Sequence, residues 1–291
     1  MKQSFPLLLP LGILAFALIG CGGRPSNFSA NAQVGTAASP TPAPASTPTS
    51  TPNPTSTAAP VPPPSGALSS ALPTPPAGAV VLDQIQNTTD NWKTCALCAE
   101  GTNLTSVYWM APFQTTPSMT GSSREFFIGG PKWSNTLFIK TYFDHFDATH
   151  FLWDFYVYWD PTTMANIWTA ELDFWQVVNG KEFMIGSQCN FGQGYWDIWD
   201  QKANQWLHST VRCQRMAPNT WHHIQWYLYR DNNTYHYDTL VVDGTAYNIN
   251  RTFSPTPSNW PSQTGVQWQL DKSSTGVDLH EWVDNVKLTV W

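Results

Sequence analysis

The sequence predicts an all-β protein, an antiparallel two-sheet jelly-roll sandwich preceded by a disordered tether rich in proline, threonine, serine and alanine. Three observations predict the sandwich. Apolar and polar residues alternate along several runs, turn residues separate these runs, and no segment has a long period of 3.6 residues. Many strands at such spacing are typical of antiparallel sandwiches and jelly rolls.

The N-terminus begins with Lys2 and an apolar run, residues 6–20, which fits the core of a secretory signal better than a membrane span. The run ends in "LIGC", which resembles the lipobox of bacterial lipoproteins; an ordinary signal with a chance cysteine is the alternative. The resemblance implies removal of residues 1–20 and lipidation of Cys21. Because Gly22 follows, it also implies an extracytoplasmic location in the cell envelope, at the outer membrane, with the lipid as the only membrane contact.

Residues 21–79 form the predicted tether. Residues 25–82 contain no Asp, Glu, Lys or Arg, and 13 of the 24 prolines lie in residues 39–78. Such a segment has too little apolar side chain to offset the entropy lost on ordering. Proline stiffens it toward polyproline II, with a rise of about 3.1 Å per residue. We therefore expect an extended, lipid-anchored linker.

Residues 80–291 are long enough for one large sandwich and contain all 16 tryptophans. No second linker and no internal repeat interrupts this segment, so we expect one domain. The net charge of −6 provides no basic surface, which argues against nucleic acid as a partner.

Cysteine content agrees with an exported protein. Without Cys21, four cysteines remain, an even number that is typical of structural disulfides outside the cytoplasm. Proximity along the chain favours the pairs Cys95–Cys98 and Cys189–Cys213. A redox pair or half of a zinc site are alternatives for "CALC", but a thioredoxin-like motif needs a βαβ context that the sequence lacks.

Alternation is clearest in "FLWDFYVYWD", "AELDFWQV" and "HIQWYLYR". Each run places aliphatic and aromatic side chains on one face and carboxylates, amides and polar-tipped rings on the other. Further strands are expected in "YHYDTLVVDG", "GVQWQL" and "HEWVDNVKLTVW", with turns at "RDNN" and "VDGT".

Residues 221–250, in which Trp-His-His opens one strand and Val-Asp-Gly closes the next, resemble a strand pair of concanavalin A-like lectin/glucanase and laminin-G-type domains. Residues 281–291 are similar to the last strand of such domains. The resemblance covers most of residues 80–291 and implies the jelly roll, but this sandwich hosts lectins, hydrolases and adhesion modules alike. Many relatives carry calcium; no loop here is dense enough in Asp to name as a calcium site, and we expect no other cofactor.

"TAELDFWQV" resembles the catalytic strand of concanavalin-like glucanases, Glu-x-Asp-x-Glu or Glu-x-Asp-x-x-Glu. The resemblance implies that Glu171 is the nucleophile and Asp173 its helper, if the protein is an enzyme. The position of the acid falls on Trp175, or on Gln176 if a bulge turns it to the same face. Neither side chain can protonate a leaving group, and general acid catalysis contributes ~10²–10⁴-fold.

Three other interpretations of this run are open. Asp154 or Glu182 could supply the missing acid from another strand, or the carboxylates could belong to a solvated sheet face. A third reading is a binding face, because sugars pair polar hydroxyl edges with apolar C–H faces. If the strands neighbour each other, the polar faces merge into one concave surface whose candidate ligand-binding residues are Asp154, Tyr156, Tyr158, Glu171, Asp173, Trp175, Gln176, Tyr227 and Tyr229.

Two further groups of residues have no predicted catalytic or metal-binding role. Residues 202–204 are expected at the tip of a hairpin that holds Trp196, Trp199 and Trp206. His222 and His223 are adjacent in a strand, so they point to opposite faces and do not form a metal pair.

The sequence therefore predicts a tethered, non-catalytic, carbohydrate-binding module of the cell envelope whose partner is a polysaccharide or glycan. A concanavalin-like glycoside hydrolase that uses Glu171 is the first alternative. An adhesion or envelope module that binds protein is the second.

Overall fold

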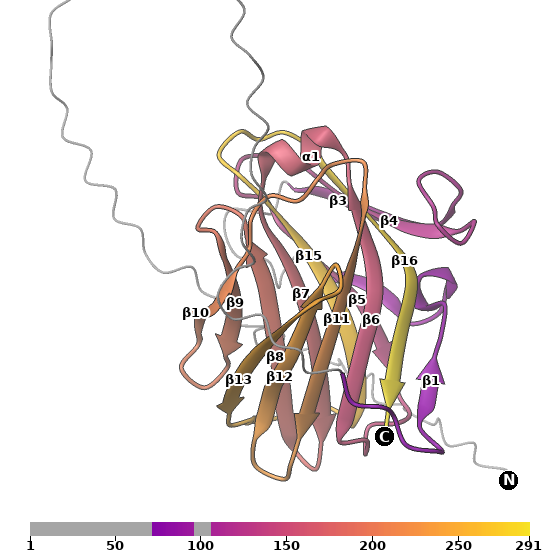
Figure 1. Cartoon of the computed structure of the whole chain (residues 1–291), viewed down its shortest axis with the longest axis vertical. Helices are drawn as coiled ribbons and strands as arrows, with labels where there is room; N and C mark the ends of the chain where they lie inside the picture. The colour runs from indigo at the N-terminus through magenta and orange to yellow at the C-terminus, as the bar shows by residue number, and fades with distance from the viewer. Residues whose placement is uncertain (1–71, 96–105) are drawn as a thin grey trace, which may run out of the picture.

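The computed structural model of the chain describes residues 72–95 and 106–291. These residues form two antiparallel β-sheets packed face to face, which confirms the predicted all-β sandwich (Figure 1). Two short helices accompany the strands, η1 (Ile85–Asn87) and α1 (Pro161–Asn166). Within the described residues, no helix is long and apolar enough to cross a membrane.

Sheet A has the spatial order β13–β12–β11–β6–β16–β4–β3, and β1 pairs with the end of β16. Its strands are β1 (Val80–Leu82), β3 (Val107–Gln114), β4 (Ser123–Gly129), β6 (His150–Trp159), β11 (Trp221–Arg230), β12 (Tyr235–Val242), β13 (Thr245–Phe253) and β16 (Leu279–Val290).

Sheet B has the order β10–β9–β8–β7–β15–β5–β2, and β14 pairs with β8. Its strands are β2 (Trp92–Cys95), β5 (Leu137–Tyr142), β7 (Ile167–Val178), β8 (Lys181–Asn190), β9 (Tyr195–Asp200), β10 (Gln205–Arg212), β14 (Thr256–Pro257) and β15 (Gln263–Lys272).

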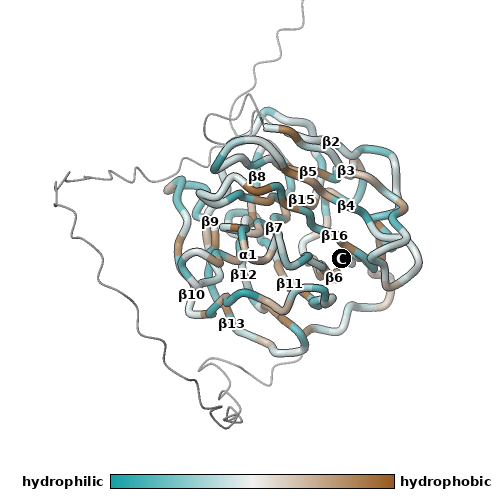
Figure 2. Tube along the Cα trace, turned by 90° about the horizontal axis from the view of Figure 1, so that it is seen from above, coloured by the Kyte–Doolittle hydropathy of each residue, from teal (hydrophilic) through white to brown (hydrophobic). Residues whose placement is uncertain are grey.

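The core lies between the sheets and follows the predicted alternation. Every inward side chain of β6 is at most 2% exposed. Phe151 packs on Phe174 of the opposite sheet at 4.2 Å between ring centroids, and Trp153 meets Trp268 edge-on at 5.2 Å. Figure 2, which views the sandwich from above, shows β8 and β15 on one side of this interior and β11 and β12 on the other.

The strand pair expected in residues 221–250 is present. β11 and β12 are antiparallel, and the Asp243–Gly244 turn joins β12 to β13. Both turn residues have positive φ, 48° and 78°, which is the two-residue hairpin geometry that Asp-Gly favours. The Asp243 carboxylate also accepts hydrogen bonds from His222 Nδ1 and the His223 amide, at 2.8 Å each.

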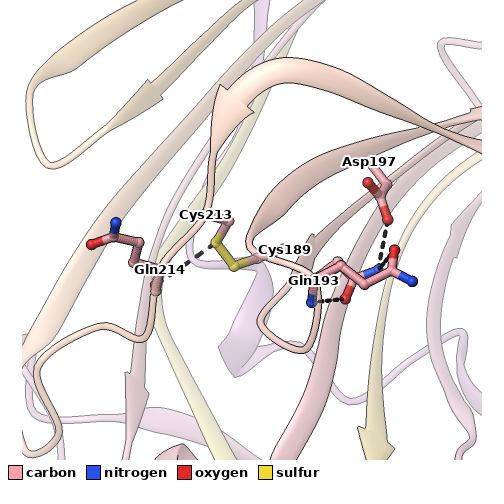
Figure 3. The surroundings of a disulfide bond; sticks show 6 residues. Cys189, Gln193, Asp197, Cys213 and Gln214 are labelled. Atoms are coloured by element: carbon pink, nitrogen blue, oxygen red, sulfur yellow. Dashed lines mark hydrogen bonds between the residues drawn. A yellow bond between two sulfur atoms is a disulfide. The ribbon is translucent and has the colours of Figure 1, made fainter. Parts of the chain in front are cut away.

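A disulfide joins Cys189 of β8 to Cys213, which confirms this predicted pair. The two Cα atoms are 5.6 Å apart, and the bridge encloses the hairpin formed by β9 and β10 (Figure 3). Residues 202–204 form the tip of this hairpin, as expected. Trp196 and Trp199 are buried, and Trp206 is half-buried against Trp199.

Several sequence-based expectations concern residues outside the described ranges. These are the signal peptide, the lipidated Cys21 and most of the tether. Cys98 also lies outside these ranges, so the Cys95–Cys98 bridge stays a prediction.

Candidate functional site

The predicted site residues lie on two opposite faces of the sandwich. β6 and β11 are neighbours in sheet A, and β7 belongs to sheet B. Asp154, Tyr156, Tyr158, Tyr227 and Tyr229 therefore share the outer face of sheet A, while Glu171, Asp173 and Trp175 share the outer face of sheet B. β7 does not neighbour β6 or β11, so the condition for one merged concave surface is not met.

Gln176 lies on neither outer face. β7 pairs with β8 without a register shift from Thr169 to Val178, so no bulge turns Gln176 outward. Its side chain is 0% exposed and points between the sheets. Its amide nitrogen donates to the carbonyl oxygens of Phe146 (2.6 Å) and Ala148 (3.0 Å), and its oxygen accepts from Arg230 Nε. Gln176 is a structural group of the interior, which corrects its assignment as a ligand-binding residue.

The third outward position on β7 belongs to Trp175, whose indole packs across Gly265 of β15. A Cβ atom at residue 265 would lie 2.4 Å from the indole nitrogen, so the ring requires glycine there. Trp175 is 3% exposed and packs with Leu137, Ile139 and Val177. The glucanase-like run thus has a buried apolar ring where a glucanase has its acid.

The alternative acids also lie away from Glu171. Asp154 is on the far side of the sandwich. Glu182 opposes Val177 near the other end of β7, six residues along the strand, or about 20 Å at ~3.3 Å per residue.

A row of polar side chains crosses five strands of sheet B on its outer face. In register, His208 of β10 opposes Asp197 of β9, Asp197 opposes Gln188 of β8, Gln188 opposes Glu171 of β7, and Glu171 opposes Gln269 of β15. Asn190 and Asp271 flank this row on one side, and Asp173 and Gln267 flank it on the other. We call these nine residues the polar band.

Hydrogen bonds fix the orientation of the band at its β9 end. Asp197 is 1% exposed, and its carboxylate accepts from His208 Nδ1 (2.6 Å), Gln188 Nε2 (3.0 Å) and Asn190 Nδ2 (2.9 Å). Figure 3 shows Asp197 and Gln193 beside the disulfide. Because Nδ1 of His208 faces the carboxylate, Nε2 is the nitrogen left to meet solvent or a ligand, and half of this side chain is exposed.

The β15 end is held in the same way. Gln269 Nε2 donates to Glu171 Oε2 (2.8 Å) and to Asp271 Oδ1 (2.9 Å), so one amide bridges two carboxyl groups. Gln267 Nε2 donates to Asp173 Oδ2 (2.7 Å), and the Ser187 amide donates to Asp173 Oδ1 (3.0 Å).

Burial raises the pKa of Asp173 to about 6, although hydrogen bonds with Glu171 and Gln267 oppose the rise. Burial also raises the pKa of Asp271 to about 6. Asp173 is 2% exposed, so it does not belong to a freely solvated sheet face. Most hydrogen-bonding side chains of the band are buried, and Glu171, Asp271 and His208 are its accessible members.

Aromatic and cationic groups border the band at both ends. Tyr195 stacks on His208 at 4.5 Å, and the Arg212 guanidinium lies 3.9 Å from the centre of the Tyr195 ring. Trp168 of β7, three residues before Glu171, packs over Gly192 after β8 and meets Trp133 edge-on at 5.5 Å. Trp133 is 49% exposed and lies two residues before Asn135, whose side chain hydrogen-bonds to Asp271.

Sequence reasoning missed most of the band, although β15 carries a signal for it. In "QTGVQWQLDK", Gln267, Gln269 and Asp271 alternate with Val266, Trp268 and Leu270, which is the same two-residue period as in β7. Asp197 and His208 lack such a signal, because only the register of β8, β9 and β10 aligns them with Glu171.

Metal ligation is not evident in the part of the chain that the structure describes. No group of three or more His, Cys, Asp and Glu side chains there is placed to hold an ion. His222 is buried and His223 points outward, as their adjacency in β11 predicts.

No family model matches the sequence, and no curated protein matches it. Solved structures similar to the chain include the globular domain of T. cruzi calreticulin, with 7% identity and a TM-score of 0.43 over 72% of this chain and 88% of that one. Another is a family 11 carbohydrate-binding module from Clostridium thermocellum, with 10% identity and a TM-score of 0.33 over 71% and 94%.

A further similar structure belongs to the carbohydrate-binding modules of the β-sandwich superfamily, with 8% identity and a TM-score of 0.38. The match covers 69% of this chain and 58% of that chain. Identities this low do not transfer a ligand or an activity.

Proposed function

We propose that this domain binds carbohydrate without cleaving it, and that the polar band is its binding site. The observation that carries the proposal is the row from His208 to Gln269. In it, an imidazole, two carboxylates and two amides from five adjacent strands are oriented by hydrogen bonds to one another. Adjacent strands are ~4.8 Å apart, so the row is about 19 Å long, enough for several sugar units in line.

The chemistry of the band matches a neutral sugar chain. Carboxylates accept hydrogen bonds from hydroxyl groups, amides donate and accept, and rings at the ends offer apolar surface to C–H faces. Four carboxyl groups in one band disfavour a chain of uronates through like-charge repulsion. Burying ionisable groups also costs stability, and a ligand-binding role accounts for their retention on an outer face.

Glycoside hydrolysis is the second candidate, and Asp271 is the observation that favours it. Glu171 and Asp271 both accept a hydrogen bond from Gln269 Nε2, so the two carboxyl groups are close together, as the ~5–5.5 Å pair of a retaining glycosidase must be. Asp271 also has a pKa raised toward the range of a general acid. Binding is preferred because both groups are engaged by Gln269 and Asp271 also accepts a hydrogen bond from Thr169.

Calorimetric titration and reducing-end assays on neutral polysaccharides (mixed-linkage β-glucan, xylan, mannan) and on polygalacturonate test the proposal. We expect a neutral polysaccharide to bind without cleavage, and Glu171→Gln to weaken binding by about tenfold, as the loss of a hydrogen bond to a charged group predicts. Asp144→Asn, an exposed carboxylate in the loop between β5 and β6, is the matched control and should bind normally. Cleavage lost in both Glu171→Gln and Asp271→Asn would establish the hydrolase instead.

The setting of the domain is part of the proposal. The "LIGC" sequence and the charge-free residues 25–82 support a lipoprotein of the cell envelope, anchored through Cys21. Residues 21–79 would then hold the binding domain at a distance from the membrane while it reaches for polysaccharide.

A further inference from the structure

Asp154 lies at the centre of a second polar row, on the outer face of sheet A. In register, Gln225 of β11 opposes Asp154 of β6, and Asp154 opposes Lys287 of β16. The three side chains alternate with buried ones along their strands, so all three point outward. The row therefore presents a donor, an acceptor and a cationic donor across three adjacent strands.

The Asp154 carboxylate is fixed in place but keeps capacity for a ligand. Its Oδ1 accepts from His223 Nε2 and its Oδ2 accepts from Gln225 Nε2, both at 2.7 Å. The Asp154 side chain is 25% exposed and that of His223 is 26% exposed. A carboxylate has about four acceptor sites, so two remain for hydroxyl groups after these bonds.

Aromatic rings border this row on both sides. On one side, Tyr156 stacks on His223 at 4.2 Å with an interplanar angle of 3°, and Tyr158 contacts Trp221 at 5.3 Å. On the other side, the Tyr227 hydroxyl bonds to His150 Nδ1 at 2.9 Å. All of these rings are half-buried.

We propose that this face is a second carbohydrate site, centred on Asp154, and that the domain is therefore bivalent. A polar row between apolar rings is complementary to a sugar, whose hydroxyl groups surround an apolar ring face. The inference extends the proposed function but stands on different residues. The two sheets pack ~10 Å apart with a buried hydrophobic core between them, so one sugar chain cannot occupy both outer faces. Two faces can bind two chains and cross-link them.

The two sites also differ in charge. The polar band brings four carboxyl groups together, whereas the row on sheet A combines Asp154 with Lys287. The sheet A site therefore lacks the strong like-charge barrier against an acidic sugar that the band has. We expect it to accept neutral chains and to tolerate isolated uronates better than the band does.

The test is the stoichiometry of hexasaccharide binding by calorimetry, together with turbidity when the domain is mixed with the matching long polysaccharide. Cello-, xylo-, manno- and laminarihexaose are the probes. We expect two hexasaccharides per wild-type domain and turbidity from cross-linking. Asp154→Asn and Glu171→Gln should each weaken one site about tenfold, so that titration at a concentration that still fills the intact site reports one hexasaccharide and the turbidity falls. Asp144→Asn should leave both unchanged.

The outcomes separate this inference from the proposed function. If the wild type binds one hexasaccharide and only Glu171→Gln weakens that binding, the second site is wrong and the polar band stands as proposed. If the wild type binds one hexasaccharide and only Asp154→Asn weakens that binding, both the polar band and bivalent binding are wrong. Failure of the wild type to bind any probe would overturn both. Circular dichroism of each variant excludes a loss of binding through unfolding.

Discussion

Glu281 is a carboxyl group inside the apolar core, and its environment makes the stability of the fold depend on pH. The side chain is 0% exposed, its Oε2 accepts from the Trp159 indole at 2.8 Å, and its Oε1 has no partner among residues 72–95 and 106–291. Burial raises the pKa of Glu281 to about 8. The folded state therefore holds a proton between pH 4.5 and 8 that the unfolded state has released, and stability falls as pH rises through this window.

We expect the free energy of unfolding to lose up to ~1.4 kcal/mol per pH unit in this window through Glu281. Glu281→Gln keeps the shape and removes the titration, so its stability should fall less between pH 5 and pH 8. Denaturant unfolding at both pH values measures the difference. Parallel curves for the wild type and the variant would contradict a protonated Glu281 in the core.

At the scale of elements, Gln176 ties β7 to the loop before β6 and to the end of β11. We expect Gln176→Glu to destabilise the domain by about 1–3 kcal/mol, because the carbonyl groups of Phe146 and Ala148 lose their donor and face an anion. No hydrolysis should appear, since the side chain points inward. Thermal unfolding and a reducing-end assay measure both effects.

Gln205→Glu is the control for that change, because Gln205 is exposed at the start of β10. Its effect on stability should stay within about 0.5 kcal/mol. Sugar cleavage by Gln176→Glu, with normal stability, would show that β7 is bulged and that its outer face includes residue 176.

The strands were predictable because each carries its own two-residue period, and that period correctly paired Glu171 with Asp173 on one face. What the period cannot supply is which strands neighbour each other. β6 and β7 are separated by a single short helix, yet they enter different sheets. The polar band depends on this long-range pairing. The local pattern alone therefore could not place Asp197 and His208 in one row with Glu171.

At the scale of the whole molecule, the proposed lipid anchor would determine where the domain works. Cys21→Ser should remove the lipid and move the protein from the membrane fraction to the soluble fraction, because the lipid is the proposed membrane contact. Fractionation of cells that express wild type and variant measures this. A variant that remains on membranes after a salt wash would contradict the lipoprotein assignment.

The short β1 strand sets how the domain responds to force. Val80, Val81 and Leu82 pair with Val290, Thr289 and Leu288, and the first two are exposed. Tension from a tethered N-terminus must pass through these three residue pairs before it reaches the sandwich. We therefore expect β1 to separate from β16 first, which lengthens the extended segment before the domain. The strands that carry both proposed sugar sites then stay folded under load.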